Sequence, residues 1–543
     1  MTPEEVAAFL KLVRENAIKP TSDPAEIAAM INAQRPKIRL PGDNRELGQF
    51  AREVGEILSK QNLFRRDLIA VTVNAEKKRT DPVSPEWLRT WAEHHLVCFK
   101  ERELGSGTNA RVIEIVKTMN VDTARGTLAS EQFFGQLREI DQVNTIRMPV
   151  IMPDGRIELA PMGYCAESRV FTVENEITYD EQMTLDRAKE IISELYSQFP
   201  FVGHERCLAV QLAALLTVFA VGILPKTATR PGFIYIANDS DAGKTMLAKS
   251  AITPVTGEIS ERAFPRSEET RKALDQLAVD GVPVVLFDNV KGKLGGEEIE
   301  AFMTSTRRSG RIIGEGGGFN VPNVTTCFFT GNDFEVTRDM CQRCLFVELF
   351  IAEIDSTQRR FKRIITEQLL AEVAFRNEIC SALWTMVRYW DGQGRPRAKT
   401  IMPKCPQWSA VIGGIVEAVG FGNCCAKPEI ASSGGDVLEM QKLVRELAPG
   451  TADQSRSTFP EVMSKIREMG LFEKLELRTK KGEIQEVTDS EGNLTPAGRS
   501  HFGRLFRKFD QRLFPGEDGE RLRWVVHGPK DSRKFLVIRE PVG

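Results

Sequence analysis

The sequence lacks an apolar run long enough to cross a membrane. The longest run, 208–224, is interrupted by Gln211 and Thr217 and ends before Pro225, so it is shorter than the ~20 residues that a span needs. We expect it to form a buried helix. The first residues, MTPEEVAAFLKLVREN, also lack the basic segment and long apolar core of a secretory signal. The sequence therefore predicts a cytoplasmic protein.

Histidine is scarce, and the cysteines do not form a recognisable framework. The five histidines are scattered and the ten cysteines fall at irregular spacings, which favours a reducing compartment over a disulfide scaffold. Cys341 and Cys344 form a C-x-x-C pair, but no second pair follows at zinc-ribbon spacing. We therefore expect no zinc site of the structural type.

Net charge is almost absent. The 73 Lys+Arg residues and 75 Asp+Glu residues leave a formal charge of -2, so the average composition gives no sign of a nucleic-acid binder. Hydrophobic residues at 41% and charged residues at 27% exclude a wholly disordered or collagen-like chain. At one domain per ~150 residues, the length predicts about three to four units.

A phosphate-binding loop is predicted where an apolar strand runs into a helix, in the segment GFIYIANDSDAGKTMLA. The pattern G-x-x-x-x-G-K-[ST] is met at Gly243, Lys244 and Thr245, with Asn238 in place of the first glycine. Asparagine tolerates positive φ, so Asn238 can still support the tight turn that aims backbone N–H groups at phosphate oxygens. The following helix N-terminus also favours anions.

The residues of this loop have separate expected roles. Lys244 would bridge the β- and γ-phosphates of ATP as a point charge, and the Thr245 hydroxyl would complete the shell of a Mg²⁺ ion. The remaining residues would contact the nucleotide around them. The predicted nucleotide-binding set is Asn238, Asp239, Ser240, Asp241, Ala242, Gly243, Lys244, Thr245 and Met246.

Three later segments place polar residues beside predicted strands. The apolar run VVLFD ends in Asp288, whose carboxylate would emerge at the sheet edge where open α/β proteins bind ligands, and there bind Mg²⁺. The strand VTTCFFTGN ends in Asn332, which could orient the attacking water. Arg338 and Arg343 precede the strand at 345–350 and could reach a phosphate bound by a neighbouring subunit.

In this order, NDSDAGKTMLA, VVLFDNVKG, FFTGND and DMCQRCLFVELF resemble the AAA+ ATPase core, in particular the superfamily-three helicases of small viruses, phages and plasmids. The resemblance covers about 233–349, roughly a fifth of the chain. The stretch RMPVIMPDGRIELAPMGYCAESRVFT also resembles the segment before the helicase core of phage and plasmid primase-helicases.

The resemblance implies ATP and Mg²⁺ as cofactors and a ring, commonly a hexamer, that pumps single-stranded nucleic acid. It places Lys244 and Thr245 on the nucleotide and Mg²⁺, and Asp288 on Mg²⁺. It further implies Asn332 as a sensor of the γ-phosphate and Arg343 as an arginine finger acting in trans.

One departure from the family concerns hydrolysis. Asn289 stands beside Asp288 where many relatives carry a second acid that polarises water, and an amide cannot serve as a base. Either hydrolysis is slow, or a different acid such as Glu298 or Glu300 acts instead.

A second departure concerns contact with DNA. The segment RIIGEGGGFNVPN sits where the family places a DNA-tracking β-hairpin, but its tip has glycines and Glu315 rather than lysine. Phe319 could stack on a base and Arg311 could touch a phosphate, since unspecific strand binding combines both kinds of contact. Lys291 and Lys293 are the alternative pore residues.

Basic residues concentrate near the C-terminus. On a helix that starts at Thr495-Pro496, Arg504, Arg507 and Lys508 fall at i, i+3 and i+4 and share one face. Two short strands follow, RLRWVV and KFLVIR, as in the wing of a winged-helix domain. We expect this region to bind duplex DNA, and its predicted contacts are Arg504, Arg507, Lys508, Arg523 and Lys534.

The fold class is therefore predicted as α/β. Its expected parts are an N-terminal α+β domain for assembly or DNA handling (1–200), an AAA+ P-loop core with a parallel sheet (201–392), and a helical linker with a winged-helix-like domain (393–543). The expected function is an ATP-dependent, ring-forming DNA helicase or translocase in the replication of a phage, plasmid or mobile element. The alternative is a nucleotide-switched initiator or loader that assembles on DNA without unwinding it. A transcription regulator is less favoured because it would leave the P-loop unused.

Overall fold

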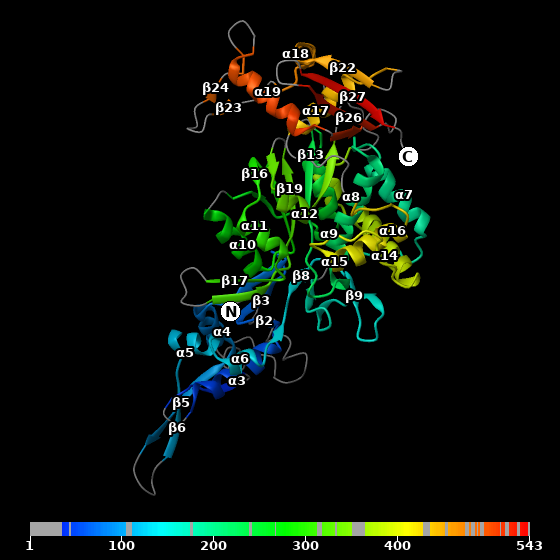
Figure 1. The fold of residues 1–543 in the computed structure, drawn as a ribbon. Coiled ribbons are helices and arrows are strands. Elements are labelled where there is room, and N and C mark those ends of the chain that lie inside the picture. The colour runs from blue at the N-terminus through cyan, green and yellow to red at the C-terminus, as the bar shows by residue number, and fades with distance from the viewer. Residues whose placement is uncertain are drawn as a thin grey trace.

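The described elements form an elongated molecule, with the N-terminal elements at one end, an α/β body in the middle and the C-terminal elements at the other end (Figure 1). The computed structural model describes residues 35–42, 45–104, 111–173, 177–237, 242–265, 268–311, 318–331, 334–349, 364–426, 435–450, 454–472, 477–478, 484–485, 487–488, 494–510, 512–515, 521–528 and 533–540.

The N-terminal part combines two sheets with short helices. One sheet has the order β1-β5-β6 and the other β4-β3-β2-β7. The strands are β1 (Lys37–Arg39), β2 (Leu63–Arg66), β3 (Ile69–Asn74), β4 (Arg79–Pro82), β5 (Val97–Leu104), β6 (Arg111–Val116) and β7 (Arg138–Glu139). The helices are α3 (Leu47–Ser59), α4 (Pro85–His95), α5 (Val121–Leu128) and α6 (Glu131–Phe134). On α3, Phe50, Ala51, Val54 and Leu58 recur at helical spacing and are buried, as their pattern predicts.

Five short strands connect this part to the body. They are β8 (Gln142–Asn144), β9 (Pro149–Ile151), β10 (Ile157–Leu159), β11 (Gly163–Cys165) and β12 (Val170–Thr172). Strands β9 and β10 pair antiparallel around the Asp154-Gly155 turn, where Gly155 has φ 85. The two strands form a β-hairpin.

The body is built on a five-stranded sheet with the order β14-β15-β19-β13-β21, in which every pairing is parallel. Its strands are β13 (Gly232–Ala237), β14 (Glu261–Ala263), β15 (Val284–Asp288), β19 (Thr326–Gly331) and β21 (Cys344–Leu349). The near-continuous apolar runs of β13, β15 and β19 suit a sheet covered on both faces. The mixed α/β class with a parallel sheet is confirmed.

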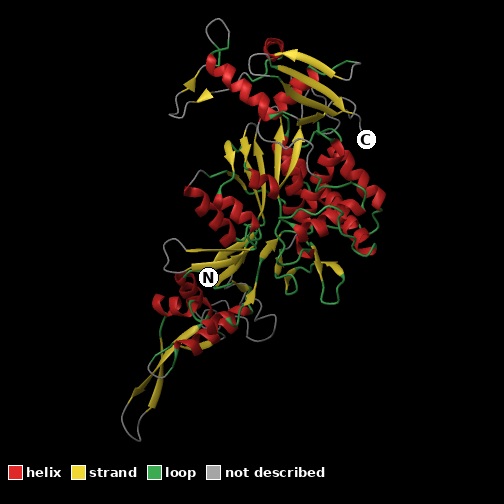
Figure 2. Ribbon diagram, in the orientation of Figure 1, coloured by secondary structure: helices red, strands yellow, loops and turns green. Residues whose placement is uncertain are grey.

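Side chains alternate between two cores on the two faces of this sheet. Phe233 and Tyr235 belong to the core on one face, whereas Ile234 between them belongs to the other, as the period of two requires. The first face packs on α7 (Leu185–Tyr196), α8 (His204–Phe219), α9 (Lys244–Thr256), α13 (Glu367–Ala371) and α14 (Val373–Gly392), together with the one-turn η2 (Val221–Ile223). The second packs on α10 (Glu268–Asp280), α11 (Glu297–Thr304) and α12 (Arg338–Arg343). Figure 2 shows helices on both sides of the strands.

The first of these cores also contains residues that come well before and well after the strands of the sheet in the sequence. It includes Ile146 and Met148 from before residue 200, and Trp408 and Ile415 from after residue 392. The later residues lie in α15 (Pro406–Trp408), the π-helical η4 (Ser409–Gly413) and α16 (Gly414–Ala418). Trp408 is fully buried, and its indole N–H donates to Thr217 Oγ1 at 2.9 Å. Most of the helix predicted at 208–224 is α8 (His204–Phe219), which is buried, and the run then continues as η2.

Two pairs of short strands lie beside the sheet. Strands β16 (Gly292–Leu294) and β20 (Phe334–Val336) run parallel, and β17 (Arg307–Arg311) and β18 (Gly318–Pro322) form an antiparallel pair. This second pair lies where a β-hairpin is expected from the sequence.

The C-terminal elements have an apolar core of their own. A four-stranded antiparallel sheet with the order β22-β27-β26-β25 packs against helices, and a small β23-β24 pair lies apart from it. The elements are α17 (Gly435–Glu446), β22 (Gln454–Thr458), α18 (Phe459–Glu468), β23 (Leu477–Arg478), β24 (Ile484–Gln485), α19 (Pro496–Lys508), β25 (Arg512–Pro515), β26 (Arg521–His527) and β27 (Lys534–Glu540). The two strands predicted near the C-terminus are β26 and β27, which pair along their whole length.

No helix in the described residues is long and apolar enough to cross a membrane. Within the same residues, no group of three or more histidine, cysteine or carboxylate side chains is placed to hold a metal ion.

Candidate functional site

The candidate site lies at the carboxyl edge of the parallel sheet, where β13, β15 and β19 end side by side. Gly243 precedes α9 with φ 85, a conformation that glycine adopts without strain. Lys244 is the first residue of α9 and is only 5% exposed. Ala242 is buried and Met246 packs against the core. The predicted ligands Asn238, Asp239, Ser240 and Asp241 lie outside the described residues.

Asp288 and Thr245 meet at this edge although 43 residues separate them. The Thr245 hydroxyl donates to Asp288 Oδ1 at 2.8 Å, and the Thr330 hydroxyl donates to the same oxygen from the neighbouring strand β19. The backbone N–H of Asn289 in turn donates to Thr330 Oγ1 at 3.1 Å. One carboxylate oxygen is therefore fixed by hydroxyl groups from a helix and from a strand.

The two oxygens from Thr245 and Asp288 fit a magnesium site. Mg²⁺ prefers hard oxygen ligands at about 2.0–2.1 Å in octahedral geometry, so two neighbouring ligands lie about 2.9 Å apart. The observed separation of 2.8 Å matches that spacing. In such a site the hydroxyl would turn its lone pair to the metal, and the remaining positions would go to water and phosphate oxygens.

The backbone after Asp288 turns sharply. Asn289 has φ 53, in the left-handed region that asparagine tolerates better than most residues, and the Val290 N–H donates to Thr330 O at 2.8 Å. Beside this turn is a cavity of about 760 Å³, lined by Asp288, Asn289, Lys291 and Lys293. Both lysines are exposed. The cavity therefore joins the candidate metal ligand to two cations.

The acids considered as substitutes for Asn289 have other partners. Glu298 Oε2 forms an ion pair with Arg308 at 2.8 Å. Glu300 Oε1 accepts hydrogen bonds from Gly296 N at 3.1 Å and Thr337 Oγ1 at 2.6 Å. Both carboxylates hold local structure, so neither stands ready as the general base in this conformation.

The structure does not bring Arg343 to this edge. Arg343 immediately precedes β21, whose first residue, Cys344, pairs with Gly232 at the opposite, amino-terminal edge of the sheet. Its side chain is 12% exposed, forms an ion pair with Asp339 and donates to Glu300 O at 3.2 Å. Arg343 is thus about one strand length from Asp288 of its own chain. Arg338 begins α12, and Asn332 lies outside the described residues.

The β17–β18 pair places its two candidate contacts differently. Arg311 is exposed at the end of β17. Phe319 is 6% exposed and belongs to the core that also holds Phe302 and Val321, so its ring is not accessible to a base. The expected stacking of Phe319 is corrected accordingly: in β18 it points inward with Val321, while Gly318 and Asn320 point outward.

The C-terminal candidates gather on the outer sides of α19 and the sheet. Arg504 and Arg507 are exposed on α19, whose opposite face buries Phe502 and Phe506. Lys534 is exposed at the start of β27 and Arg523 is half-buried on β26. Lys508 is the last residue of α19.

Two residues near the site have no assigned role in the sequence-based prediction. Thr330 fixes Asp288, and a signal for it exists, because a hydroxyl residue follows the apolar Phe328-Phe329 just before the strand ends at Gly331. Phe199 lies beside the loop: a Cβ added at Gly243 would be 3.4 Å from the Phe199 ring. No pattern in the sequence indicates that contact.

Replacing Thr330 with valine should lower Mg²⁺-dependent ATP turnover, the activity that the sequence predicts, by about tenfold. Valine keeps the shape but removes the hydroxyl that bonds Asp288 and Asn289, so the carboxylate loses a fixed orientation. Steady-state phosphate release as a function of Mg²⁺ concentration measures the effect, which should include a higher Mg²⁺ requirement. Thr330→Ser should restore turnover, and wild-type behaviour of Thr330→Val would contradict a positioning role.

No family model matches the chain, and no curated protein matches it. Among solved structures, the apo C-terminal region of NrS-1 has a TM-score of 0.34 at 8% identity, with 73% of this chain and 79% of that chain covered. SCCmec type IV Cch, described as an active helicase, has a TM-score of 0.23 at 10% identity over 70% and 88% of the two chains. JCV helicase has a TM-score of 0.21 at 16% identity over 38% and 63%. Scores of this size do not establish a common fold, so the function below is argued from the residues of this chain.

Proposed function

We propose that the chain is a ring-forming AAA+ ATPase that uses ATP and Mg²⁺ to move along DNA and separate its strands. The observation that carries the proposal is the contact between Thr245 and Asp288 at the carboxyl edge of a parallel sheet. Lys244 at the start of α9 adds the cation that a triphosphate needs at the same edge. The order of the four motifs, which resembles superfamily-three helicases, supports replication of a phage, plasmid or mobile element as the setting.

The proposed chemistry assigns each group one task. Lys244 would bind the β- and γ-phosphates, and Thr245 and Asp288 would hold Mg²⁺, which would neutralise charge on the phosphates. Asn332 orients the attacking water. Arg343 reaches the γ-phosphate of the neighbouring subunit, after its ion pair with Asp339 opens on assembly.

DNA is proposed to contact two regions. Exposed Arg311, Lys291 and Lys293 supply phosphate contacts for a single strand in the ring, and Phe319 is left out because it is buried. The helices and four-stranded sheet near the C-terminus form a winged-helix-like unit, in which Arg504 and Arg507 meet the phosphates of a duplex. The parts remain assigned as 1–200 for assembly or DNA handling, 201–392 for ATP hydrolysis and 393–543 for duplex binding.

Strand separation on forked DNA, with and without ATP, tests the proposal. We expect Lys244→Ala to abolish ATP-dependent unwinding, because the triphosphate loses its bridging cation. Lys399→Ala, which removes an exposed lysine elsewhere, is the matched control and should unwind normally. Equal unwinding by wild type and Lys244→Ala would refute the proposal. The molecular mass with ATP and Mg²⁺ should reveal a ring, commonly a hexamer in the family that the motifs resemble.

A second candidate is a nucleotide-switched initiator or loader that assembles on DNA without unwinding it. The observation in its favour is the surroundings of Asn289, where Glu298 and Glu300 are both held in other contacts. ATP turnover that stays negligible with single-stranded DNA, together with ATP-dependent assembly, would favour this candidate over the helicase.

A further inference from the structure

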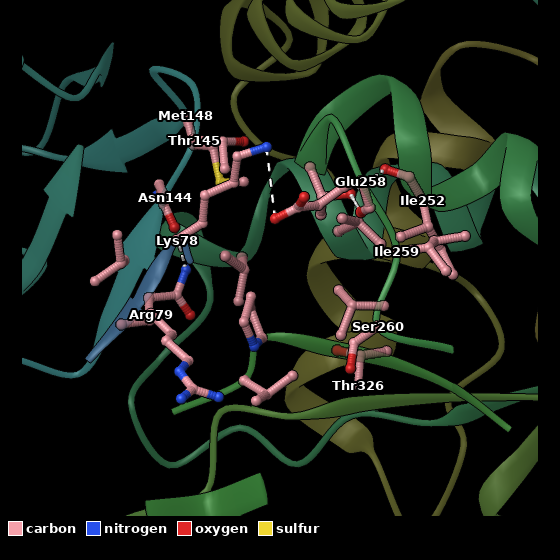
Figure 3. A pocket seen from close by; sticks show the side chains of 18 of the residues that line it. Lys78, Arg79, Asn144, Thr145, Met148, Ile252, Glu258, Ile259, Ser260 and Thr326 are labelled. Atoms are coloured by element: carbon pink, nitrogen blue, oxygen red, sulfur yellow. Dashed lines mark hydrogen bonds and ion pairs between the residues drawn. The ribbon is translucent and has the colours of Figure 1, made fainter. Parts of the chain in front are cut away.

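A second cavity, of about 410 Å³, lies at the opposite edge of the central sheet (Figure 3). Its walls come from distant parts of the chain. Lys78 ends the β3–β4 turn, Arg79 begins β4, Asn144 ends β8, and Thr326 begins β19. The volume falls in the range of small-molecule sites.

This cavity is separate from the candidate nucleotide site. Strand β15 begins at Val284 in the cavity wall and ends at Asp288, so its length of about 13 Å separates the two places. Helix α9 likewise begins at Lys244 and ends at Thr256 in the cavity wall. A ligand here would not overlap a nucleotide bound through Lys244.

The lining combines an apolar floor with an excess of positive charge. Val218, Val221, Ile252 and Ile259 contribute hydrocarbon surface. The ionisable lining residues are the cations Lys77, Lys78, Arg79, Arg230 and Arg262 and the carboxylates Glu76 and Glu258. Apolar walls around a few convergent polar groups are typical of a small-ligand site, and this charge balance favours an anion.

Not all of the cations have acidic partners. Lys78 pairs with Glu258 at 3.6 Å, as Figure 3 shows, and Arg79 pairs with Asp81 at 2.9 Å. Within the described residues neither Arg230 nor Arg262 forms an ion pair. Arg230 donates instead to the backbone oxygen of Val324, and Arg262 Nε reaches Ser260 Oγ at 3.4 Å.

The surroundings of Arg230 also favour an anion. Desolvation lowers the pKa of this arginine to about 10, although the charge of Asp141 opposes the shift. Arg230 is half-buried, and among the described residues it bonds a carbonyl oxygen rather than a carboxylate, so a bound anion would offset part of its desolvation cost. Fixed amides complete the wall: Gln142 Nε2 donates to Asn144 Oδ1 at 2.6 Å, and both side chains are buried.

We propose that this cavity binds a small organic anion that carries a phosphate or carboxylate group on an apolar body. Arg230 and Arg262 hold the anionic group, and the floor made by Val218, Val221, Ile252 and Ile259 holds the apolar body. The exposed Lys77 at the β3–β4 turn adds a cation at the mouth. The ligand thereby joins the N-terminal sheet to the body.

The full-length protein can be titrated with 8-anilinonaphthalene-1-sulfonate, whose sulfonate on aromatic rings copies the proposed chemistry. AMP and indole-3-acetate then compete for the site and distinguish phosphate from carboxylate ligands, and inorganic phosphate, which has no apolar body, should compete poorly. We expect saturable binding that Arg262→Gln weakens by about tenfold, since a charge-assisted hydrogen bond is lost. Lys77→Gln, at an exposed side chain, should weaken binding by a smaller factor.

Three controls test whether the dye binds in this cavity. Lys244→Ala should leave binding unchanged, whatever becomes of ATP hydrolysis, which keeps this test independent of the proposed function. Lys399→Gln should also bind normally, and thermal melting checks that Arg262→Gln is folded; if it is not, Lys77→Gln decides. The proposal would be overturned if the dye showed no saturable binding, or if the folded cavity variants bound it as tightly as wild type. It would also be overturned if only Lys244→Ala lost dye binding.

Discussion

Asp288→Asn is expected to lower Mg²⁺-dependent ATP turnover by a factor of about 100–1000. Asparagine has the shape of aspartate, and its amide oxygen can still accept from Thr245 and Thr330, so the fold at the sheet edge should persist. What is lost is the negative charge that holds Mg²⁺. Phosphate release at saturating ATP, with ATP binding measured separately, gives the comparison.

The matched control for this variant is Glu190→Gln, which removes an exposed carboxylate from α7. It should hydrolyse ATP at the wild-type rate. If Asp288→Asn also keeps that rate at low Mg²⁺, Asp288 is not a metal ligand, and the assignment of the sheet edge as the catalytic centre fails.

Arg66→Ala is expected to weaken the junction between the N-terminal sheet and the body by about 3–5 kcal/mol. Arg66 is 1% exposed and donates to Ala278 O at 2.8 Å, Val279 O at 2.6 Å and Pro322 O at 3.2 Å. Alanine leaves these acceptors without their donor and opens a cavity. Hydrogen exchange of the amides in α10 and β18 should accelerate by about a hundredfold or more.

The adjacent Arg65 provides the control for that experiment. It lies on the same strand and pairs with Glu139 at 2.8 Å, but both side chains are about one-third exposed. Exposed ion pairs contribute roughly 0–1 kcal/mol, so Arg65→Ala should hardly change the exchange of α10. Similar exchange in the two variants would mean that Arg66 does not hold the junction.

Local patterns in the sequence predict much of the body. The apolar runs before Asp288 and Asn332 identify buried parallel strands, and Gly243-Lys244-Thr245 marks the start of a helix. Side-chain alternation could also have indicated that Phe319 shares the inward face of β18 with Val321. The prediction that Phe319 stacks on a base relied only on where the segment lies in the chain. It did not take into account that side chains alternate between the two faces of a strand.

Contacts between distant segments could not be predicted in the same way. The hydroxyl of Thr330 reaches Asp288 only because β19 pairs with β15 in one particular register. Arg66 reaches carbonyl groups more than 200 residues away, and its charge gives no local sign of being buried. The position of Arg343 at the amino-terminal edge likewise depends on how β21 pairs with β13.

Helix α9 connects the two edges of the sheet, since it begins at Lys244 and ends at Thr256. Its carboxyl end is fixed by Arg376, which donates to Pro254 O, and by Thr145, which donates to Val255 O. If a ligand bound near Lys244 or in the cavity near Thr256 shifts this helix, the affinity for each ligand depends on the other. This dependence is reciprocal. An anion that tightens ATP binding by some factor would be held more tightly by that same factor when ATP is bound.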